Sequence, residues 1–281
     1  MSVSLVALRC RTSDRTPAAG RGVDELVPLV AEQLGVNART IGEPSEPRQD
    51  HFDDVLRDAR GCLLEAGGQV EDAIGGGNVP VLLAAECSIA LTTLSAVLAA
   101  RPEARVLWLD AHADFNTPDS TPSGYLGGMA LAGACGRWDA GLGREPIAAE
   151  RVVLAGVRDL DPPEREALEG GPATVIGASP VETLVAVKNA LDGAPVYVHL
   201  DLDVIDPESF PAQFPAPDGL APDKLYDVLE AVVGESEVVG LEVTAFEAPE
   251  DELERRAAVS TAMHVLEPLL DAIVEEVPVR H

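Results

Sequence analysis

The segment RVLWLDAHADFN, residues 105 to 116, changes character halfway along its length. Its first five residues, 105 to 109, form a short apolar run that is typical of a buried strand. Asp110, His112 and Asp114 follow directly, and their side chains are common metal ligands. In open parallel sheets, ligands bind at the carboxyl ends of the strands, so this segment predicts a parallel sheet with a metal site at its edge.

Similar apolar runs recur along the chain, separated by longer stretches with apolar residues at spacings of three and four. The expected strands are 3 to 7, 80 to 84, 105 to 109, 152 to 155, 174 to 176, 196 to 200 and 238 to 241, with a weaker one at 38 to 41. The expected helices include 24 to 34, 55 to 74, 90 to 100, 181 to 191 and 253 to 274. We therefore expect one α/β domain over residues 1 to 281, with three α/β/α layers and a central, mostly eight-stranded parallel sheet.

The charge balance argues against two classes of partner. With 48 acidic and 20 basic residues, the net charge of −28 would repel nucleic acid and anionic lipid. The N-terminal sequence MSVSLVALRCRTSD has no signal-peptide pattern, and we expect no apolar run long enough to cross a bilayer. These features predict a cytoplasmic protein that binds neither nucleic acid nor membrane.

The spacing of the four cysteines gives no indication of disulfide bonds. Cys10, Cys62, Cys87 and Cys135 are scattered without a CxxC spacing. We therefore expect neither a disulfide framework nor a zinc ribbon. Three of the four are expected to be buried as small apolar residues.

Two further strand ends carry residues of the same kind as the DAHAD segment. Glu86 and Cys87 follow one apolar run, and Asp201 and Asp203 follow another. Any single aspartate at a strand end can simply cap a helix, but three strand ends together favour a metal centre. The oxygen-rich donor set suits manganese better than zinc and leaves iron or cobalt open. Two such ions can share and activate a water, which predicts hydrolysis.

Three segments resemble signatures of the arginase (ureohydrolase) family: AAECS at 84 to 88, DAHADFN at 110 to 116 and HLDLDVIDP at 199 to 207. The family's patterns are a GGDHS-like turn, DAHxD and SxDxDxxDP. The resemblance implies an arginase-like fold and two Mn²⁺ ions. It implies that one ion is held by Cys87, Asp110, Asp114 and Asp201, and the other by Asp110, His112, Asp201 and Asp203. Asp114 would also orient the attacking hydroxide.

The resemblance also implies where a guanidino amino-acid substrate would bind. The stretch NTPDSTPS resembles the loop that binds the α-carboxylate, which suggests Asn116, Thr121 and Ser123 as donors. The segment RDLDPPE resembles the acidic segment that receives the α-ammonium group, which suggests Asp161 and Glu164. The alternative is that these two acids cap the helix that follows them.

The chain departs from the family pattern at three positions. Cys87 stands where the family has a metal-binding histidine, and the alternative is that Cys87 is a bystander and water completes the shell. Gly127 stands where arginases carry a proton-shuttling histidine; His199 could substitute, unless it is a packed or surface residue. An ungapped match places Ala245 at the guanidine-recognising acid, so Glu247, or else Glu242, is the expected replacement.

These departures favour a particular substrate. An N-hydroxyguanidine is less basic than a guanidine and carries its own mobile proton, so it tolerates the loss of a shuttle. We therefore expect hydrolysis of Nω-hydroxy-L-arginine to hydroxyurea and L-ornithine, as in an antibiotic-biosynthetic branch of the family. The alternatives are an ordinary arginase, an agmatinase or another ureohydrolase, and a catalytically silent metal-binding protein. The short C-terminal stretch 277 to 281 after the last expected helix favours a monomer.

Overall fold

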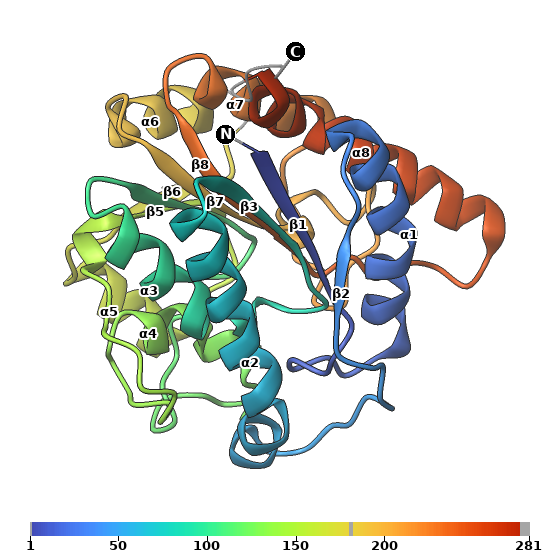
Figure 1. Ribbon diagram of the computed structural model, residues 1–281. Coiled ribbons are helices and arrows are strands. Elements are labelled where there is room, and N and C mark those ends of the chain that lie inside the picture. Colours follow the sequence, from blue (N-terminus) through green and yellow to red (C-terminus); the bar gives the residue numbers. More distant parts are fainter. Residues whose placement is uncertain (1, 180–181, 276–281) are drawn as a thin grey trace.

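A single parallel sheet forms the centre of the protein (Figure 1). The computed structural model describes residues 2–179 and 182–275. The strands are β1 (Ser2–Leu8), β2 (Arg39–Ile41), β3 (Asn78–Leu83), β4 (Arg105–Leu109), β5 (Val152–Val157), β6 (Thr174–Gly177), β7 (Val196–Asp201) and β8 (Val238–Thr244). They lie in the order β2-β1-β3-β8-β7-β4-β5-β6, and every pairing is parallel. The expected eight-stranded parallel sheet is confirmed.

Helices cover both faces of this sheet and form two separate cores (Figure 1). One face packs against α1 (Pro17–Leu34), α6 (Glu182–Leu191), α7 (Pro222–Val233) and α8 (Glu252–Glu275). The other packs against α2 (Phe52–Gly75), α3 (Ala90–Ala100), α4 (Ala130–Ala134) and α5 (Pro162–Glu169). The three-layer expectation is therefore confirmed, while α4, α5 and α7 were not among the helix ranges named from the sequence. Residue 181, the first of one expected helix, lies outside the described residues, as does the stretch 277 to 281.

Helix α1 illustrates how local sequence sets these elements. Thr16 Oγ1 accepts a hydrogen bond from the Ala18 N–H at 3.2 Å and so satisfies a free donor of the first turn. Gly35, at φ 64°, ends the helix in a left-handed conformation that glycine adopts without strain. Between these ends, buried Leu26 and Val30 lie one helical turn apart and face the sheet.

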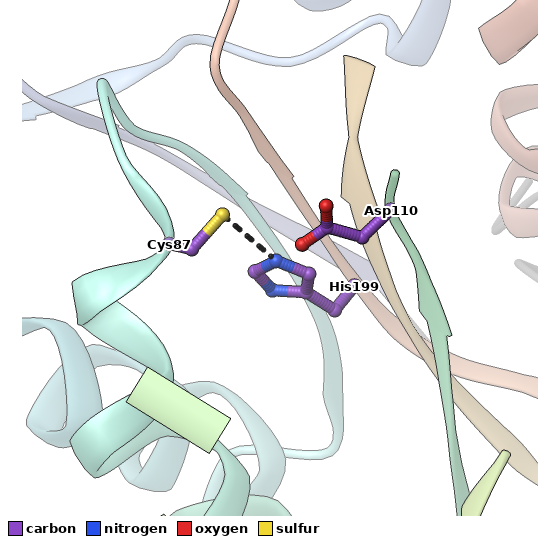
Figure 2. A group of neighbouring side chains, drawn as sticks. All are labelled: Cys87, Asp110 and His199. Atoms are coloured by element: carbon purple, nitrogen blue, oxygen red, sulfur yellow. Dashed lines mark hydrogen bonds between the residues drawn. The ribbon is translucent and has the colours of Figure 1, made fainter. Parts of the chain in front are cut away.

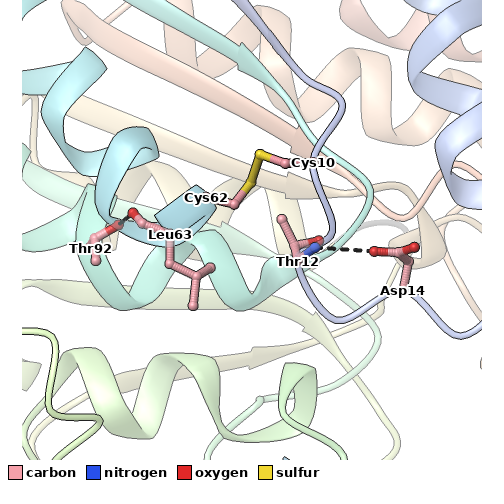
Figure 3. The surroundings of a disulfide bond; sticks show 6 residues. All are labelled: Cys10, Thr12, Asp14, Cys62, Leu63 and Thr92. Atoms are coloured by element: carbon pink, nitrogen blue, oxygen red, sulfur yellow. Dashed lines mark hydrogen bonds between the residues drawn. A yellow bond between two sulfur atoms is a disulfide. The ribbon is translucent and has the colours of Figure 1, made fainter. Parts of the chain in front are cut away.

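Cys10 and Cys62 form a disulfide, which corrects the expectation that no such bond would occur (Figure 3). Cys10 follows β1, Cys62 lies within α2, and their Cα atoms are 5.9 Å apart. The two cysteines are 52 positions apart in the sequence, so no local spacing motif predicts the bond between them. It is the packing of α2 against the sheet that brings them together.

Helix α8 corrects a second expectation. It is long and apolar enough to cross a membrane by length and composition alone. However, its apolar residues Ala262, Val265, Leu266, Leu269 and Leu270 are buried in the core that it shares with α1 and α7. Core helices of soluble proteins pass the same test, so α8 is weak evidence for a membrane span.

Candidate metal centre and active site

The predicted ligands meet at the carboxyl ends of adjacent central strands. Cys87 lies in the turn after β3, Asp110 directly follows β4, and Asp201 and Asp203 lie at and just beyond the end of β7. Strand β8, between β3 and β7, brings Ala245 to the same edge. The cavity at this edge is lined by Cys87, Asp110, His112, Asp114, Asp201 and Asp203 on one side. All the predicted metal ligands therefore share one cavity.

One potential cation site lies around Cys87 (Figure 2). The ligand atoms of Cys87, Asp110 and His199 lie within 4.8 Å of one another. The Cys87 thiol donates to Asp201 Oδ2 at 2.8 Å, and His199 Nε2 lies 3.3 Å from the Cys87 Sγ. Thr244 Oγ1 is 3.1 Å from the same sulfur. The Cys87 sulfur is therefore in direct contact with Asp201, His199 and Thr244.

A second cluster surrounds His112. Its Nδ1 lies 3.0 Å from Asp203 Oδ2 and 3.3 Å from Asp110 Oδ1. Backbone groups orient the same carboxylates, since the Ala111 N–H donates to Asp203 and the Asp203 N–H donates to Asp201. Asp110 thus belongs to both clusters, as a carboxylate that bridges two ions must.

Two residues at the cavity have unusual backbone conformations. Asp114 has φ 49° and Ala245 has φ 58°, a left-handed region that L-residues with a side chain adopt at some cost. Such outliers persist only where the surrounding structure holds them, and they gather at functional sites. Here the conformation places Asp114 among the other carboxylates, where its side chain is buried.

Without a cation the site is electrostatically strained. Burial, followed by the neighbouring Asp203 carboxylate, raises the pKa of Asp110 to about 6. Burial and then nearby carboxylates raise the pKa values of Asp114 and Asp201 well above the usual range. Burial alone would lower the pKa of His112, but Asp203 and Asp110 outweigh it and raise that pKa to about 12. These shifts mean that the buried carboxylates compete for positive charge.

The donor set fits divalent cations. Carboxylates crowded into a buried space repel one another, and a bound cation would stabilise their charged forms. The set combines carboxylate oxygens with one imidazole and one thiol sulfur. Within this set Asp110 lies close both to Cys87 and to His112, so the set suits a pair of ions better than a single one.

The other wall of the cavity contains the position expected for a shuttle histidine. A Cβ atom on Gly127 would lie 2.5 Å from Cε1 of Tyr125 and 2.8 Å from its hydroxyl oxygen. The Tyr125 ring is itself held between Phe214, with ring centroids 5.1 Å apart, and the guanidinium of Arg15, 4.5 Å from the ring centroid. Tyr125 therefore fills the space that a side chain at position 127 would need.

The structure does not place His199 or Glu242 in the cavity. Both side chains are fully buried, and His199 Nδ1 lies 2.6 Å from Glu242 Oε1. The His199 ring also stacks on Trp108, and Glu242 accepts from the Tyr197 hydroxyl. Because β7 keeps His199 behind the metal ligands, the expectation of a proton shuttle at His199 needs correction: the residue contacts Cys87 and not the cavity.

Glu247 is also absent from the residues that line the cavity. Its carboxylate accepts from the Thr16 hydroxyl, at 2.9 Å to Oε1 and 2.6 Å to Oε2. Burial, opposed mainly by that hydrogen bond, raises its pKa. Glu247 therefore lies at the margin of the site, held by the loop that precedes α1.

Two of the residues expected to bind the amino-acid end of the substrate are in direct contact. Asn116 Nδ2 donates to Asp161 Oδ2 at 2.9 Å, so a predicted carboxylate ligand and a predicted ammonium ligand are neighbours. Thr121 Oγ1 accepts from the Gly124 N–H, and Ser123 Oγ from the Tyr125 N–H, so both hydroxyls support the turn.

Glu164 is held by backbone groups at the start of α5. Its carboxylate accepts from the Phe115 N–H at 2.8 Å and from the Asp161 N–H at 3.0 Å. The second contact is half of a capping box at the start of α5, which is the helix-capping alternative. Glu164 is buried, and both of its oxygens are engaged by backbone groups that support the DAHADF loop.

The sequence analysis gave no individual role to three residues of the cavity wall: Tyr125, Gln213 and Phe214. Tyr125 donates from its hydroxyl to Glu86 Oε2 at 2.6 Å. Gln213 and Phe214 lie in the loop after the DLD turn.

These features agree with what related proteins show. The model of the arginase family matches residues 39–270, and the chain belongs to the arginase family. It is therefore a ureohydrolase, an enzyme that cleaves C–N bonds of guanidino groups.

Two relatives illustrate the range of the similarity. The chain is 36% identical over 270 residues to the N(omega)-hydroxy-L-arginine amidinohydrolase of Streptomyces lavendulae, covering 96% of this chain and 98% of the relative. It is 31% identical to the arginase of Bacillus caldovelox, with 90% and 91% covered. Among solved structures, Entamoeba histolytica arginase with L-ornithine superposes with a TM-score of 0.82 at 22% identity, covering 95% of this chain and 98% of that one. The structural likeness confirms the arginase fold.

Proposed function

We propose that this enzyme hydrolyses Nω-hydroxy-L-arginine to hydroxyurea and L-ornithine. Water adds its oxygen to the guanidino carbon, the bond from that carbon to the δ-nitrogen breaks, and the nitrogen leaves as the amine of ornithine. The similarity to a relative named for this substrate, over nearly the whole length of both chains, supports the proposal.

The observation that carries it is the relation between Gly127 and Tyr125. The Tyr125 ring occupies the space beside Gly127, so no side chain at position 127 can move a proton to the leaving amine. An N-hydroxyguanidine is less dependent on such a group than arginine, because it is less basic and its N-hydroxyl carries a mobile proton. The cavity wall is therefore better matched to the hydroxylated substrate.

Two Mn²⁺ ions are the proposed cofactors. Cys87, Asp110, Asp114 and Asp201 would hold one, and Asp110, His112, Asp201 and Asp203 the other. When bound, the pair lowers the pKa of a shared water and supplies a nucleophile at neutral pH. Asp114 would accept a hydrogen bond from that water and orient it toward the substrate carbon.

The chain's own residues would fix the other end of the substrate. We propose that Asn116, Thr121 and Ser123 donate to the α-carboxylate and that Asp161 accepts from the α-ammonium group. The short distance from Asn116 to Asp161 supports this, because α-carboxylate and α-ammonium groups are themselves neighbours in an amino acid. Glu164 would act indirectly, through the loop that it holds.

The direct test uses two substrates. Manganese-loaded enzyme is incubated with L-arginine and, separately, with Nω-hydroxy-L-arginine at pH 7 to 9, and ornithine is quantified. We expect ornithine from the hydroxylated substrate and little from arginine. Comparable release from arginine would refute the specialisation and restore an ordinary arginase, and no release from either would contradict the proposed reaction.

We also propose that the enzyme works in the cytoplasm as a monomer built of one domain. The acidic net charge of −28 and the burial of the apolar face of α8 support the cytoplasmic setting. Size-exclusion chromatography with light scattering tests the monomer, for which a mass of about 29.4 kDa is expected.

A further inference from the structure

A guanidino group brings several N–H donors to the cavity, and these require an acceptor opposite the metal ligands. Planar groups with parallel N–H bonds pair best with a carboxylate. The carboxylates that line the cavity are Asp110, Asp114, Asp201, Asp203 and one more, Glu86. Since the four aspartates are the proposed metal ligands, Glu86 is the carboxylate left for the substrate among the cavity-lining residues that the structure describes.

The neighbouring strands explain how Glu86 reaches this wall. The Ala245 N–H donates to the Ala85 carbonyl at 3.0 Å, so the ends of β3 and β8 are joined beside Glu86. Ala245 has only a methyl side chain and also lines the cavity. The wall at the end of β8 thus carries no charge of its own, and the carboxylate beside it comes from the end of β3.

Contacts of Glu86 hold its carboxylate in a defined place. The Tyr125 hydroxyl donates to Oε2 at 2.6 Å. Burial, followed by the negative charge of Glu86, raises the pKa of Tyr125 well above its usual range, so Tyr125 stays a neutral donor. A carboxylate has about four lone-pair positions, and the Tyr125 contact therefore leaves Glu86 able to accept further hydrogen bonds.

Gln213 already occupies the place of such a donor. With its amide nitrogen turned toward the acids, Gln213 donates to Glu86 Oε1 at 3.1 Å and to Glu247 Oε1 at 3.2 Å. An amide N–H and a guanidino N–H offer the same chemistry. The cavity itself is only about 20 Å³, room for roughly one water. A bound substrate would therefore displace the Gln213 side chain, and its guanidino N–H groups would donate to Glu86 in place of the Gln213 amide.

We infer that Glu86 binds the guanidino end of the substrate and that Tyr125 is the positioning residue that holds its carboxylate; this inference rests on the proposed function. It replaces the expectation that Glu247 or Glu242 has this role. Glu242 is enclosed by His199 and Tyr197, and Glu247 is held by Thr16 outside the lining of the cavity.

The test compares ligands with and without a guanidino group. Dissociation constants of L-arginine and of L-norvaline, which shares the amino-acid end but has no terminal nitrogen, are measured by calorimetry on manganese-loaded protein. Glu86→Gln keeps the size of the side chain and removes its charge. We expect arginine to bind about tenfold more weakly or worse, because a hydrogen bond to a charged group is lost, and norvaline to change by less than about twofold.

A second variant and the metal content make the outcome decisive. Tyr125→Phe keeps the ring over Gly127 and the Glu86 carboxylate, so its effect on arginine should have the same direction and be smaller. Equal weakening of both ligands, no change in either, or loss of manganese from Glu86→Gln would each overturn the inference. Failure of the wild-type protein to hydrolyse Nω-hydroxy-L-arginine would refute the proposed reaction. The role of Glu86 would still be tested, because it depends only on how Glu86→Gln changes arginine binding relative to norvaline binding.

Discussion

The Nε2 atom of His199 lies 3.3 Å from the Cys87 Sγ, while its Nδ1 lies 2.6 Å from Glu242 Oε1. The ring is stacked on Trp108 with centroids 3.5 Å apart and an interplanar angle of 5°. His199 therefore links a proposed metal ligand to a fully buried carboxylate without reaching the cavity. Such a partner can orient a ligand and tune its affinity for metal.

Replacing His199 with Asn should weaken manganese binding. The variant loses the contact with Cys87 and leaves Glu242 Oε1 without its partner, so we expect roughly 10- to 100-fold lower affinity. The free energy of unfolding should fall by about 1–3 kcal/mol. Manganese titration followed by the paramagnetic resonance of the free ion measures the first effect, and denaturant unfolding measures the second.

Tyr197→Phe is the matched control, because it removes the other hydrogen bond to Glu242 and has no contact with Cys87. It should lose stability and keep near-normal manganese affinity. Indistinguishable manganese affinity in the two variants would show that the His199 contact does not act on the metal ligand.

Restoring a histidine at position 127 should not by itself create an arginase. The Cβ atom of Gly127→His would meet Tyr125 at 2.5–2.8 Å. Displacing a packed ring costs typically about 1–3 kcal/mol, so the melting temperature and the turnover of the hydroxylated substrate should both fall. Adding Tyr125→Asn should recover the melting temperature. Gly128→Ala is the control, since its Cβ would lie 3.9 Å from Tyr125 and should be tolerated; a stable single Gly127→His variant would contradict this packing.

The metal-free protein should lose stability as pH rises from about 5 to 8. The folded pKa of Asp110 is about 6 against an ordinary 3.8, so between about pH 4 and 6 the folded state holds a proton that the unfolded chain has released, and this stability is lost as the pH rises through 6. The pKa of His112, about 12 against 6.5, continues the loss above pH 6.5. Asp203, lowered to about 2 because the charge of His112 outweighs burial, acts in the opposite sense only below about pH 4.

Saturating Mn²⁺ should remove or reverse that slope, because metal ligands must be deprotonated to bind and metal affinity therefore rises with pH. Melting curves with chelator and with Mn²⁺, at several pH values, measure both slopes. Equal slopes in the two series would mean that these carboxylates do not bind the ion.

Removing the Cys10–Cys62 disulfide should destabilise the fold. For a loop of 52 residues, the chain-entropy estimate is up to about 4 kcal/mol. Cys62→Ser should melt at a lower temperature than the wild type under non-reducing conditions. Reductant should lower the wild-type value and leave the variant unchanged. Cys135→Ser, at a free cysteine, serves as the control, and a reductant effect that persists in Cys62→Ser would exclude this pairing.

The sequence predicted the sheet and most of its helices because both depend on local periodicity. For example, the strand expected at residues 105 to 109 has the same bounds as β4, Arg105–Leu109, in the structure. The same periodicity could not reveal short α4, with five residues, or the Cys10–Cys62 pair, which depends on packing between distant segments.

The candidate site divides in the same way. Asp110, His112, Asp201 and Asp203 could be placed together because each follows a strand, and the carboxyl ends of parallel strands meet at one edge. Which way a side chain points away from a strand end was not predictable to the same degree. His199 shares a face of β7 with Asp201 but lies two residues before it, where it packs against Trp108 and pairs with Glu242. Glu86 and Tyr125 meet through loops beyond the ends of the strands.

Strand β8 is the eighth along the chain, yet it lies between β3 and β7. During synthesis on the ribosome, β3 and β7 therefore cannot be joined into one sheet until β8 is available. The parts of the cavity that follow β3 and β7 could come together only after residues 238–244 had left the exit tunnel. Nascent chains shorter than this would expose two apolar strand edges to chaperones. The enzyme thus acquires its fold and its ligand cluster late in synthesis, in one closing step.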